Sequence, residues 1–297
     1  MSAFAEGKTR GCERGDDCDK TRGYESGKNC RDDSGDVLTA REICGHIKTT
    51  GVFSVEARES VASTNTLLRE LAAQGAPEGL VVAAERQTAG KGRLGRRFHS
   101  PPGHGVYFSL LLRPGRALWD AALVTSAAAV AAARAIEETV GVRVGIKWVN
   151  DLFLDGKKVC GILTEATLGL ENSTVLSAVV GIGINVTMPE EGFPEELDRI
   201  AAALHAGDTG VRGERCRLIA ATLDNFWAYY RNLPAREFLD EYRARSIVLG
   251  RDIQVISPKG ETSARALAID DDCRLVVRYE DGSTAALGSG EISVRPI

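Results

Sequence analysis

Residues 144–166 read Val-Gly-Ile-Lys-Trp-Val-Asn-Asp-Leu-Phe-Leu-Asp-Gly-Lys-Lys-Val-Cys-Gly-Ile-Leu-Thr-Glu-Ala. Asp155-Gly156 is a strong hairpin signal, and stretches typical of strands flank it on both sides. Apolar runs that indicate further buried strands lie at 80–84, 106–112 and 175–186. Helical patterns lie at 38–47, from 63 onward, and at 119–139, 195–204, 214–230 and 235–246. We therefore expect an α+β fold in which helices cover a mixed or antiparallel sheet.

The two ends of the chain differ from this central part. Residues 1–36 are charged and rich in glycine, with almost no large apolar side chain, and this composition predicts disorder. After residue 249 only short strand patterns remain, at 253–256, 263–269, 275–279 and 292–294, which predicts a small β-barrel. The expected division is a disordered tail (1–36), a short helical lead-in (37–50), a main domain (51–248) and a C-terminal barrel (249–297).

Composition excludes several classes of protein. The net charge of −4 argues against a protein that coats nucleic acid or an anionic membrane. No stretch approaches the roughly 18 apolar residues of a membrane-spanning helix, and the N-terminus lacks the apolar core of a signal peptide, so we expect a cytoplasmic protein. Seven cysteines, an odd number spread over a long chain, favour reduced thiols over a disulfide framework.

The stretch 85–97 contains glycines at 90, 92 and 95, interleaved with the cationic side chains of Lys91, Arg93, Arg96 and Arg97. Glycines let a backbone approach a ligand, and the cations between them suit phosphate or carboxylate. The glycine spacing matches G-x-G-x-x-G, but Ser-Pro-Pro-Gly at 100–103 prevents the helix that a dinucleotide fingerprint needs. The segment therefore predicts a loop that closes over an anion, and the alternative is a solvated basic turn.

Four shorter stretches carry polar groups that suit a ligand, although each also has a structural explanation. Lys147, Asn150 and Asp151 follow a strand and could hold phosphate and Mg²⁺, or form a surface ion pair. Lys158 begins a strand, and Gly181-Ile-Gly-Ile-Asn185 is a strand whose glycines allow close approach and whose asparagine suits adenine. Ser63-Thr64-Asn65 could cap a helix or bind a polar ring.

Taken together and in this order, these stretches resemble biotin protein ligases. The matching pieces are Ser63–Asn65, Gln87 with the 90–96 loop, Ser100-Pro101, Lys147–Asp151, Gly156–Lys158 with Gly161-Ile-Leu, Gly181–Asn185 and Gly290–Arg295. The resemblance implies a class II synthetase-like catalytic domain at 51–248, binding biotin and ATP, and an SH3-like barrel at 249–297. It also implies two steps: biotin and ATP give biotinyl-5′-AMP and pyrophosphate, and a lysine of a biotin carboxyl carrier domain then takes the biotin.

The resemblance also assigns roles to residues. It makes Arg93 and Lys158 catalytic, and it makes Asp151 a ligand of Mg²⁺, directly or through water. Biotin and ATP are substrates, ATP comes with Mg²⁺, and no tightly bound cofactor is expected. The biotin site comprises Ser63, Thr64, Asn65, Gln87, Lys91, Gly92, Arg93, Lys158 and Gly161. The ATP site comprises Arg93, Arg96, Lys147, Asn150, Asp151, Lys158, Asn185 and Arg295.

The sequence departs from the family pattern at four positions. Lys91 and Leu94 stand where arginines are common, Phe98 replaces a common tryptophan, and Val149 replaces the usual proline. Lys91 keeps the positive charge without the bidentate guanidinium, and Phe98 keeps an aromatic surface without an indole N–H. We expect these changes to alter turnover without abolishing it.

Partners and alternatives follow from the same resemblance. Only about 50 residues precede the catalytic domain, so we expect no helix-turn-helix domain and no nucleic-acid or membrane partner. The expected partner is a carrier domain, that of acetyl-CoA carboxylase by resemblance, and the chain could be a monomer or a homodimer. The competing interpretations are a lipoate or octanoate transferase, which would lack the 90–96 loop, a biotin sensor without catalysis, and a nucleotide-binding scaffold without ligase activity.

Overall fold

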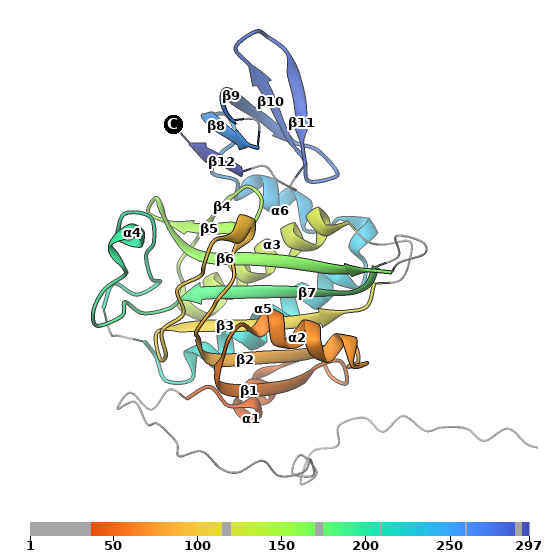
Figure 1. The fold of residues 1–297 in the computed structure, drawn as a ribbon, viewed down its shortest axis with the longest axis vertical. Coiled ribbons are helices and arrows are strands. Elements are labelled where there is room, and N and C mark those ends of the chain that lie inside the picture. Colours follow the sequence, from red (N-terminus) through yellow and green to blue (C-terminus); the bar gives the residue numbers. More distant parts are fainter. Residues whose placement is uncertain are drawn as a thin grey trace, which may run out of the picture.

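The computed structural model describes residues 37–114, 120–169, 175–207, 210–258, 260–288 and 293–296, and in the last of these segments only the side chain of Val294. Its centre is a seven-stranded sheet (Figure 1), in the order β1-β2-β3-β7-β6-β5-β4. Only β1 and β2 run parallel, and the other neighbours are antiparallel, so the expected mixed sheet is confirmed. The strands are β1 (Ser54–Val61), β2 (Leu80–Gln87), β3 (Gly105–Leu112), β4 (Gly145–Lys147), β5 (Asp151–Leu154), β6 (Lys157–Leu168) and β7 (Val175–Asn185).

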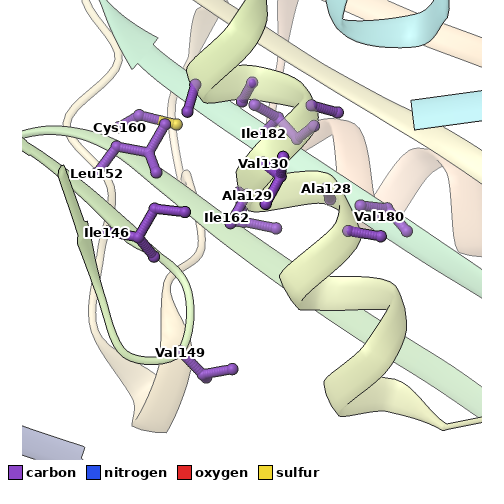
Figure 2. Packing of buried hydrophobic residues seen from close by; sticks show 14 of the residues in the cluster. Ala128, Ala129, Val130, Ile146, Val149, Leu152, Cys160, Ile162, Val180 and Ile182 are labelled. Carbon is purple, nitrogen blue, oxygen red and sulfur yellow. The ribbon is translucent and has the colours of Figure 1, made fainter. Parts of the chain in front are cut away.

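Helices cover both faces of this sheet. The long helices α3 (Ala121–Val140) and α5 (Glu214–Tyr230) pack on one face and against each other. The short helix α1 (Ala40–His46) packs beside α5. The alanines of α3 keep that helix thin, so Ala128, Ala129 and Val130 lie directly against strands β6 and β7 (Figure 2). Helix α2 (Thr64–Ala73) lies on the other face over a smaller apolar cluster, and its N-terminus therefore meets the middle of the sheet.

The C-terminal part is a separate five-stranded antiparallel sheet, in the order β11-β10-β9-β8-β12, as expected of an SH3-like domain (Figure 1). The strands are β8 (Asp252–Ser257), β9 (Gly260–Ile269), β10 (Leu275–Tyr279), β11 (Thr284–Leu287) and β12 (Ser293–Pro296).

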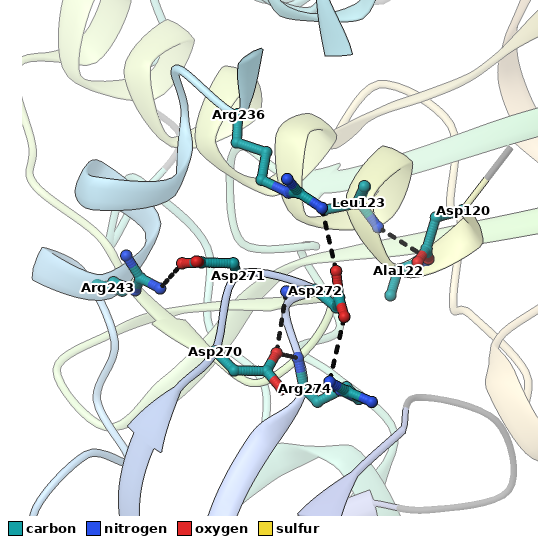
Figure 3. Close-up of polar contacts among 9 residues, drawn as sticks. All are labelled: Asp120, Ala122, Leu123, Arg236, Arg243, Asp270, Asp271, Asp272 and Arg274. Atoms are coloured by element: carbon teal, nitrogen blue, oxygen red, sulfur yellow. Dashed lines mark hydrogen bonds and ion pairs between the residues drawn. The ribbon is translucent and has the colours of Figure 1, made fainter. Parts of the chain in front are cut away.

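The turn between β9 and β10, residues 270–274, docks this sheet onto the main domain. The Cys273 carbonyl accepts the indole N–H of Trp148 at 2.9 Å, and Arg243 of α6 (Leu239–Ala244) donates to Ile269 O and Asp271. Asp272 pairs with Arg236 and with Arg274 (Figure 3). These polar contacts reach the segment that follows β4 in the main domain, and buried apolar residues of both parts belong to one cluster.

Most local predictions are confirmed, and the exceptions have physical reasons. Thr39 caps α1 by accepting from Glu42 N, and Asp155 (φ 49°) with Gly156 (φ 79°) forms the predicted hairpin turn. The predicted helix at 195–204 was too long. Helix α4 covers only Glu195–Asp198, because Ala201 pairs instead with the backbone of Lys158.

Three further predictions need comment. The helix expected at 235–246 is a 3₁₀ turn at Leu233–Ala235 followed by α6. Strands β1 and β11 were not predicted, since both are edge strands without an apolar run. The predicted tail at 1–36 and the turn at 171–173 lie outside the described residues. None of the described helices is long and apolar enough to cross a membrane.

Candidate active site

A pocket that is open at its mouth lies on the α2 face of the sheet, between the start of α2 and the loop that follows β2. Its floor is formed by glycines of β6 and β7, where Gly161 pairs with Gly183 and Leu163 with Gly181. A Cβ atom at Gly181 would lie 1.9 Å from Asn65 Oδ1, and one at Gly183 would lie 2.6 Å from Phe98 Cε1. The floor therefore has no room for side chains. The lining residues are Ser63, Thr64, Asn65, Gln87, Lys91, Gly92, Arg93, Phe98, Asn150, Lys158, Gly161, Ile162, Leu163, Gly181, Ile182 and Gly183.

One end of the pocket, which we call the ring end, is built by the first residues of α2 with Gln87 and Ser109. Ser63 is the N-cap residue, but its side chain makes no capping bond. Gln87, at the end of β2, supplies the acceptor instead, because its Oε1 accepts from Thr64 N at 2.9 Å. Its Nε2 donates to Ser100 Oγ at 2.9 Å, which fixes the orientation of the amide.

Asn65 is also held entirely by protein groups. Its Nδ2 donates to Glu165 Oε2 at 2.9 Å and to Leu163 O at 3.3 Å, while Oδ1 accepts from Ser109 Oγ at 2.6 Å. Asn65 is 4 % exposed and Ser109 is fully buried, so water does not compete for these bonds. The ring end is therefore a pre-formed polar wall.

The opposite end, the charged end, carries two cationic groups, each beside a polar neighbour. Arg93 Nη1 donates to Asn150 Oδ1 at 3.0 Å, and Asn150 Nδ2 donates to Ile162 O at 2.8 Å. Lys158 Nζ lies 2.6 Å from Asp151 Oδ1. Burial lowers the pKa of Arg93, and the nearby Asp151 carboxylate opposes that shift, but a guanidinium keeps its proton at any physiological pH. Both cations can therefore meet an anionic ligand.

The loop 88–97 folds back on itself beside the charged end. Gly92 N donates to Arg96 O at 2.7 Å, and Phe98 N donates to Gly90 O at 3.0 Å. At its tip Leu94 has φ 56° and is half exposed. No helix follows, as the prolines after the loop predict. A second, wider hollow lies on the other side of the loop, between Arg96, the start of α3 and Glu165.

Several residues expected at the site lie elsewhere. Lys147 lies over the Phe153 ring at 5.4 Å, and Arg96 faces the second hollow. Asn185, at the end of β7, donates its Nδ2 to Ala202 O at 3.0 Å. Arg295 belongs to β12, but its side chain lies outside the described residues. Lys147, Arg96 and Asn185 are therefore not among the residues that line the pocket.

Comparisons with known proteins agree with this geometry. Residues 57–185 match the Biotin/lipoate A/B protein ligase family, and residues 248–295 match the Biotin protein ligase C terminal domain. The chain is 37 % identical over 225 residues to the bifunctional ligase/repressor BirA of Bacillus subtilis, which covers 75 % of this chain and 68 % of that protein. The chain belongs to the biotin protein ligase family.

Two other relatives of this biotin protein ligase extend the comparison. The biotin--[acetyl-CoA-carboxylase] ligase of Mycobacterium tuberculosis is 31 % identical over 245 residues, covering 77 % of this chain and 85 % of that protein. The biotin protein ligase of Aquifex aeolicus in complex with biotin and ATP has 26 % identity and a TM-score of 0.66, over 82 % of this chain and 99 % of that one. The match at 248–295 also separates this ligase from lipoate transferases, with which it shares the first family match.

Sequence reasoning missed two residues of the ligase that the structure places behind the ring end. Ser109 is the one serine in the apolar and aromatic stretch 106–112, and Glu165 follows the apolar part of β6. A single polar side chain within a buried strand is the signal that could have revealed them, since such a group needs a partner. Among the described residues no three or more His, Cys, Asp or Glu side chains gather as ligands for a metal.

Proposed function

We propose that this biotin protein ligase activates biotin with ATP at the charged end of the pocket and transfers it to a lysine of a biotin carboxyl carrier domain. A biotin carboxylate oxygen attacks the α-phosphorus of ATP, and the bond from that phosphorus to pyrophosphate breaks. The ε-amine of the carrier lysine then attacks the acyl carbon of biotinyl-5′-AMP, the acyl carbon–oxygen bond breaks, and AMP leaves. The amine loses a proton to the surroundings in this second step.

The observation that carries the proposal is the placement of Arg93 and Lys158 at one end of a pocket whose other end is polar and closed. The first step brings a carboxylate against a polyphosphate, so nearby cations must offset their repulsion. Asn150 directs the Arg93 guanidinium and Asp151 holds the Lys158 ammonium before a ligand arrives. Both cations would face the oxygens on which negative charge grows, so they should act on rate more than on affinity.

The biotin ring would lie on the glycine floor against Ser63, Thr64, Asn65 and Gln87. Lys91, Gly92 and Gly161 would then enclose the acyl chain next to Arg93 and Lys158. This orientation follows from the direction of the pocket, because Ser63, Thr64 and Gln87 offer neutral hydrogen-bonding groups at the ring end and Arg93 and Lys158 offer cations at the charged end.

The nucleotide would extend from the charged end toward Arg96, Lys147, Asn150 and Asp151. Asn185 could receive the adenine amino group on Oδ1, because the bond to Ala202 O already fixes its Nδ2. Arg295 would approach the phosphates from the C-terminal domain. Asp151 offers a single carboxylate, and this fits a Mg²⁺ ion that arrives with ATP and keeps most of its waters. Bound there, Mg²⁺ would screen phosphate charge.

The carrier partner follows from a relative that is named for acetyl-CoA carboxylase. The test is ATP-dependent biotin transfer to a purified biotin carboxyl carrier domain, read as a mass increase of the carrier, with wild type beside Arg93→Ala. We expect transfer by wild type and at least a hundredfold slower transfer by the variant. Biotin binding without pyrophosphate release by wild type would favour the sensor interpretation instead.

Three further predictions about the molecule remain to be measured. We expect no specific DNA binding, and a mobility-shift assay on a biotin-operon operator checks this. Sedimentation equilibrium distinguishes monomer from homodimer with and without biotin. Cell fractionation checks the cytoplasmic location that the sequence predicts.

A further inference from the structure

Two residues behind the ring end, Glu165 and Ser109, do not line the pocket but are linked to Thr64, which does. The links run from Glu165 to Asn65, from Asn65 to Ser109, and from Ser109 to Thr64. We infer that Glu165 and Ser109 are positioning residues that fix which hydrogen-bonding group Thr64 presents to the ligand. The inference rests on the proposed binding of biotin, because it concerns how the same pocket selects its ring.

The first step is the orientation of the Asn65 amide. A carboxylate and a backbone carbonyl can only accept hydrogen bonds. Because Glu165 Oε2 and Leu163 O both lie beside the same atom of Asn65, that atom must be Nδ2. The carbonyl oxygen Oδ1 therefore faces Ser109 and cannot be exchanged with Nδ2 without the loss of two bonds. Arg69 Nη1 lies 3.2 Å from the other oxygen of Glu165 and holds the carboxylate in place.

The second step concerns the single hydrogen of the Ser109 hydroxyl. Ser109 Oγ lies 2.6 Å from Asn65 Oδ1 and 2.7 Å from Thr64 Oγ1. An amide oxygen has no hydrogen to give, so the Ser109 hydrogen must point to Asn65. The short contact between Ser109 and Thr64 then needs the hydrogen of Thr64. The other neighbour of Thr64 Oγ1, Gln87 Oε1 at 3.2 Å, is also an acceptor, so either bond uses that hydrogen within the protein.

The consequence is a fixed polarity at the ring end. Thr64 Oγ1 can only accept from a ligand, whereas Gln87 Nε2 keeps one hydrogen that is not used by Ser100. A ring with an N–H next to a carbonyl, as in a cyclic urea, matches an acceptor beside a donor. A ring that presents an acceptor to Thr64 would leave two oxygens in contact without a hydrogen, and this costs affinity when the groups are buried.

Burial makes this ordering strict. Ser109 is fully buried, and Asn65 and Thr64 are almost so, which leaves no water to reverse a bond. Gly181 confines Asn65 further, since its backbone lies against Oδ1 with no room for a Cβ atom. Of the four hydrogen-bonded residues Glu165, Asn65, Ser109 and Thr64, only Glu165 is not buried, and its side chain lines the second hollow.

The test is the dissociation constant for biotin, measured by titration calorimetry on the full chain without ATP. Ser109→Ala removes the shorter of the two contacts that hold the Thr64 hydrogen and leaves only Gln87 Oε1 at 3.2 Å, so the hydroxyl is less firmly fixed as an acceptor. We expect this change to raise the constant about tenfold. Thr64→Val removes the acceptor itself. Because both changes act through one bond, Ser109→Ala combined with Thr64→Val should bind within twofold of Thr64→Val alone. Glu165→Gln, which can present a donor to Asn65, should raise the constant about threefold or more and show the same non-additivity.

The matched control is Ser177→Ala, a buried serine of β7 that is not among the residues lining the pocket. It should bind biotin as wild type does, and thermal unfolding of every variant identifies any that is misfolded. Wild-type affinity in Ser109→Ala, or effects of Ser109→Ala and Thr64→Val that multiply, would overturn the inference. If Glu165→Gln left the dissociation constant for biotin unchanged, Glu165 would not be a positioning residue. Failure of the proposed function would appear separately, as wild type that binds biotin without turnover.

Discussion

The two ends of the pocket are built on opposite principles. At the ring end the side chains of Thr64, Asn65 and Gln87 are tied to other protein groups, and Thr64 and Asn65 are buried. At the charged end the Lys158–Asp151 pair is partly exposed, and the loop that carries Arg93 lies at the surface. The first arrangement suits recognition of one rigid ring, and the second suits groups that must follow a change in charge.

This difference predicts that changes at the two ends have different effects on biotin affinity and on turnover. A pre-formed neutral wall contributes equally to bound substrate and transition state, so changes there should alter affinity. Cations that meet growing charge contribute mainly in the transition state, so changes there should alter turnover. The comparison would therefore be wrong if variants at the ring end altered turnover and variants at the charged end altered affinity.

The largest effect is expected for Lys158→Ala. Loss of the ammonium removes a charge from the reacting oxygens and leaves Asp151 without its partner. Turnover in biotin-dependent pyrophosphate exchange should fall by about 10²–10³, while the dissociation constant for biotin changes by less than about tenfold. Lys157→Ala, at the neighbouring exposed position, is the control and should keep wild-type turnover. A Lys158→Ala variant with normal turnover but weak binding would contradict the division between the two ends.

The next effect is expected for Gly181→Ala at the ring end. The added methyl group would lie 1.9 Å from Asn65 Oδ1, so Asn65 must move and its bonds to Ser109 and Glu165 must lengthen. We expect biotin to bind at least about tenfold more weakly and the turnover of saturated enzyme to change little. Gly45→Ala, which adds a methyl group to open space in α1, should leave binding unchanged.

A smaller effect should come from the junction with the C-terminal domain. Trp148→Phe loses the bond to Cys273 O and loosens the segment that carries Asn150, the partner of Arg93. We expect kcat/KM for ATP to fall about threefold to tenfold and stability to fall by about 1 kcal/mol. Trp227→Phe, in α5 away from the pocket, should leave the kinetics for ATP unchanged. Equal effects on ATP and biotin kinetics would instead indicate a general loss of structure.

The smallest effect is expected on the pH dependence of stability, and it concerns Cys273 at the same junction. Burial raises the pKa of the Cys273 thiol to about 11, from an ordinary value of 9.0. This thiol therefore contributes stability that is complete below pH 9 and is lost as pH rises toward 11, because the unfolded chain ionises first. Urea unfolding should show that the free energy of unfolding of wild type falls between pH 8 and pH 10. In Cys273→Ala this fall should be about 1 kcal/mol smaller. If the free energy of unfolding fell equally in wild type and in Cys273→Ala, the pKa of the Cys273 thiol would be the same in the folded and unfolded protein.

Much of the fold could be predicted because local signals and tertiary structure agree. The hairpin at Asp155-Gly156 and helix α5 depend on neighbours in sequence, and both are found where the pattern places them. Edge strand β1 was missed because its side chains are largely exposed, so its sequence has no apolar run. The short α4 shows tertiary override, since pairing of Ala201 with Lys158 ends a helix that propensity would continue.

The site shows the same limit. Residues of one continuous motif, such as Ser63–Asn65 and the 90–96 loop, could be named from sequence. Ser109 and Glu165 could not, because their roles arise from contacts across 44 and 100 residues with Asn65. Placement of Lys147 over Phe153 likewise depends on the packing of side chains at the edge of the sheet, which no local pattern encodes.

The glycine floor imposes a direction on how this pocket can change during evolution or engineering. Where side chains define a cavity, substitution can enlarge it or reduce it. Gly161, Gly181 and Gly183 have no side chain to remove, so any substitution at these positions can only add atoms and make the pocket shallower. A bulkier ring could therefore be admitted only through changes in the walls, at α2 or in the loop, because the glycine floor already gives the pocket its greatest depth.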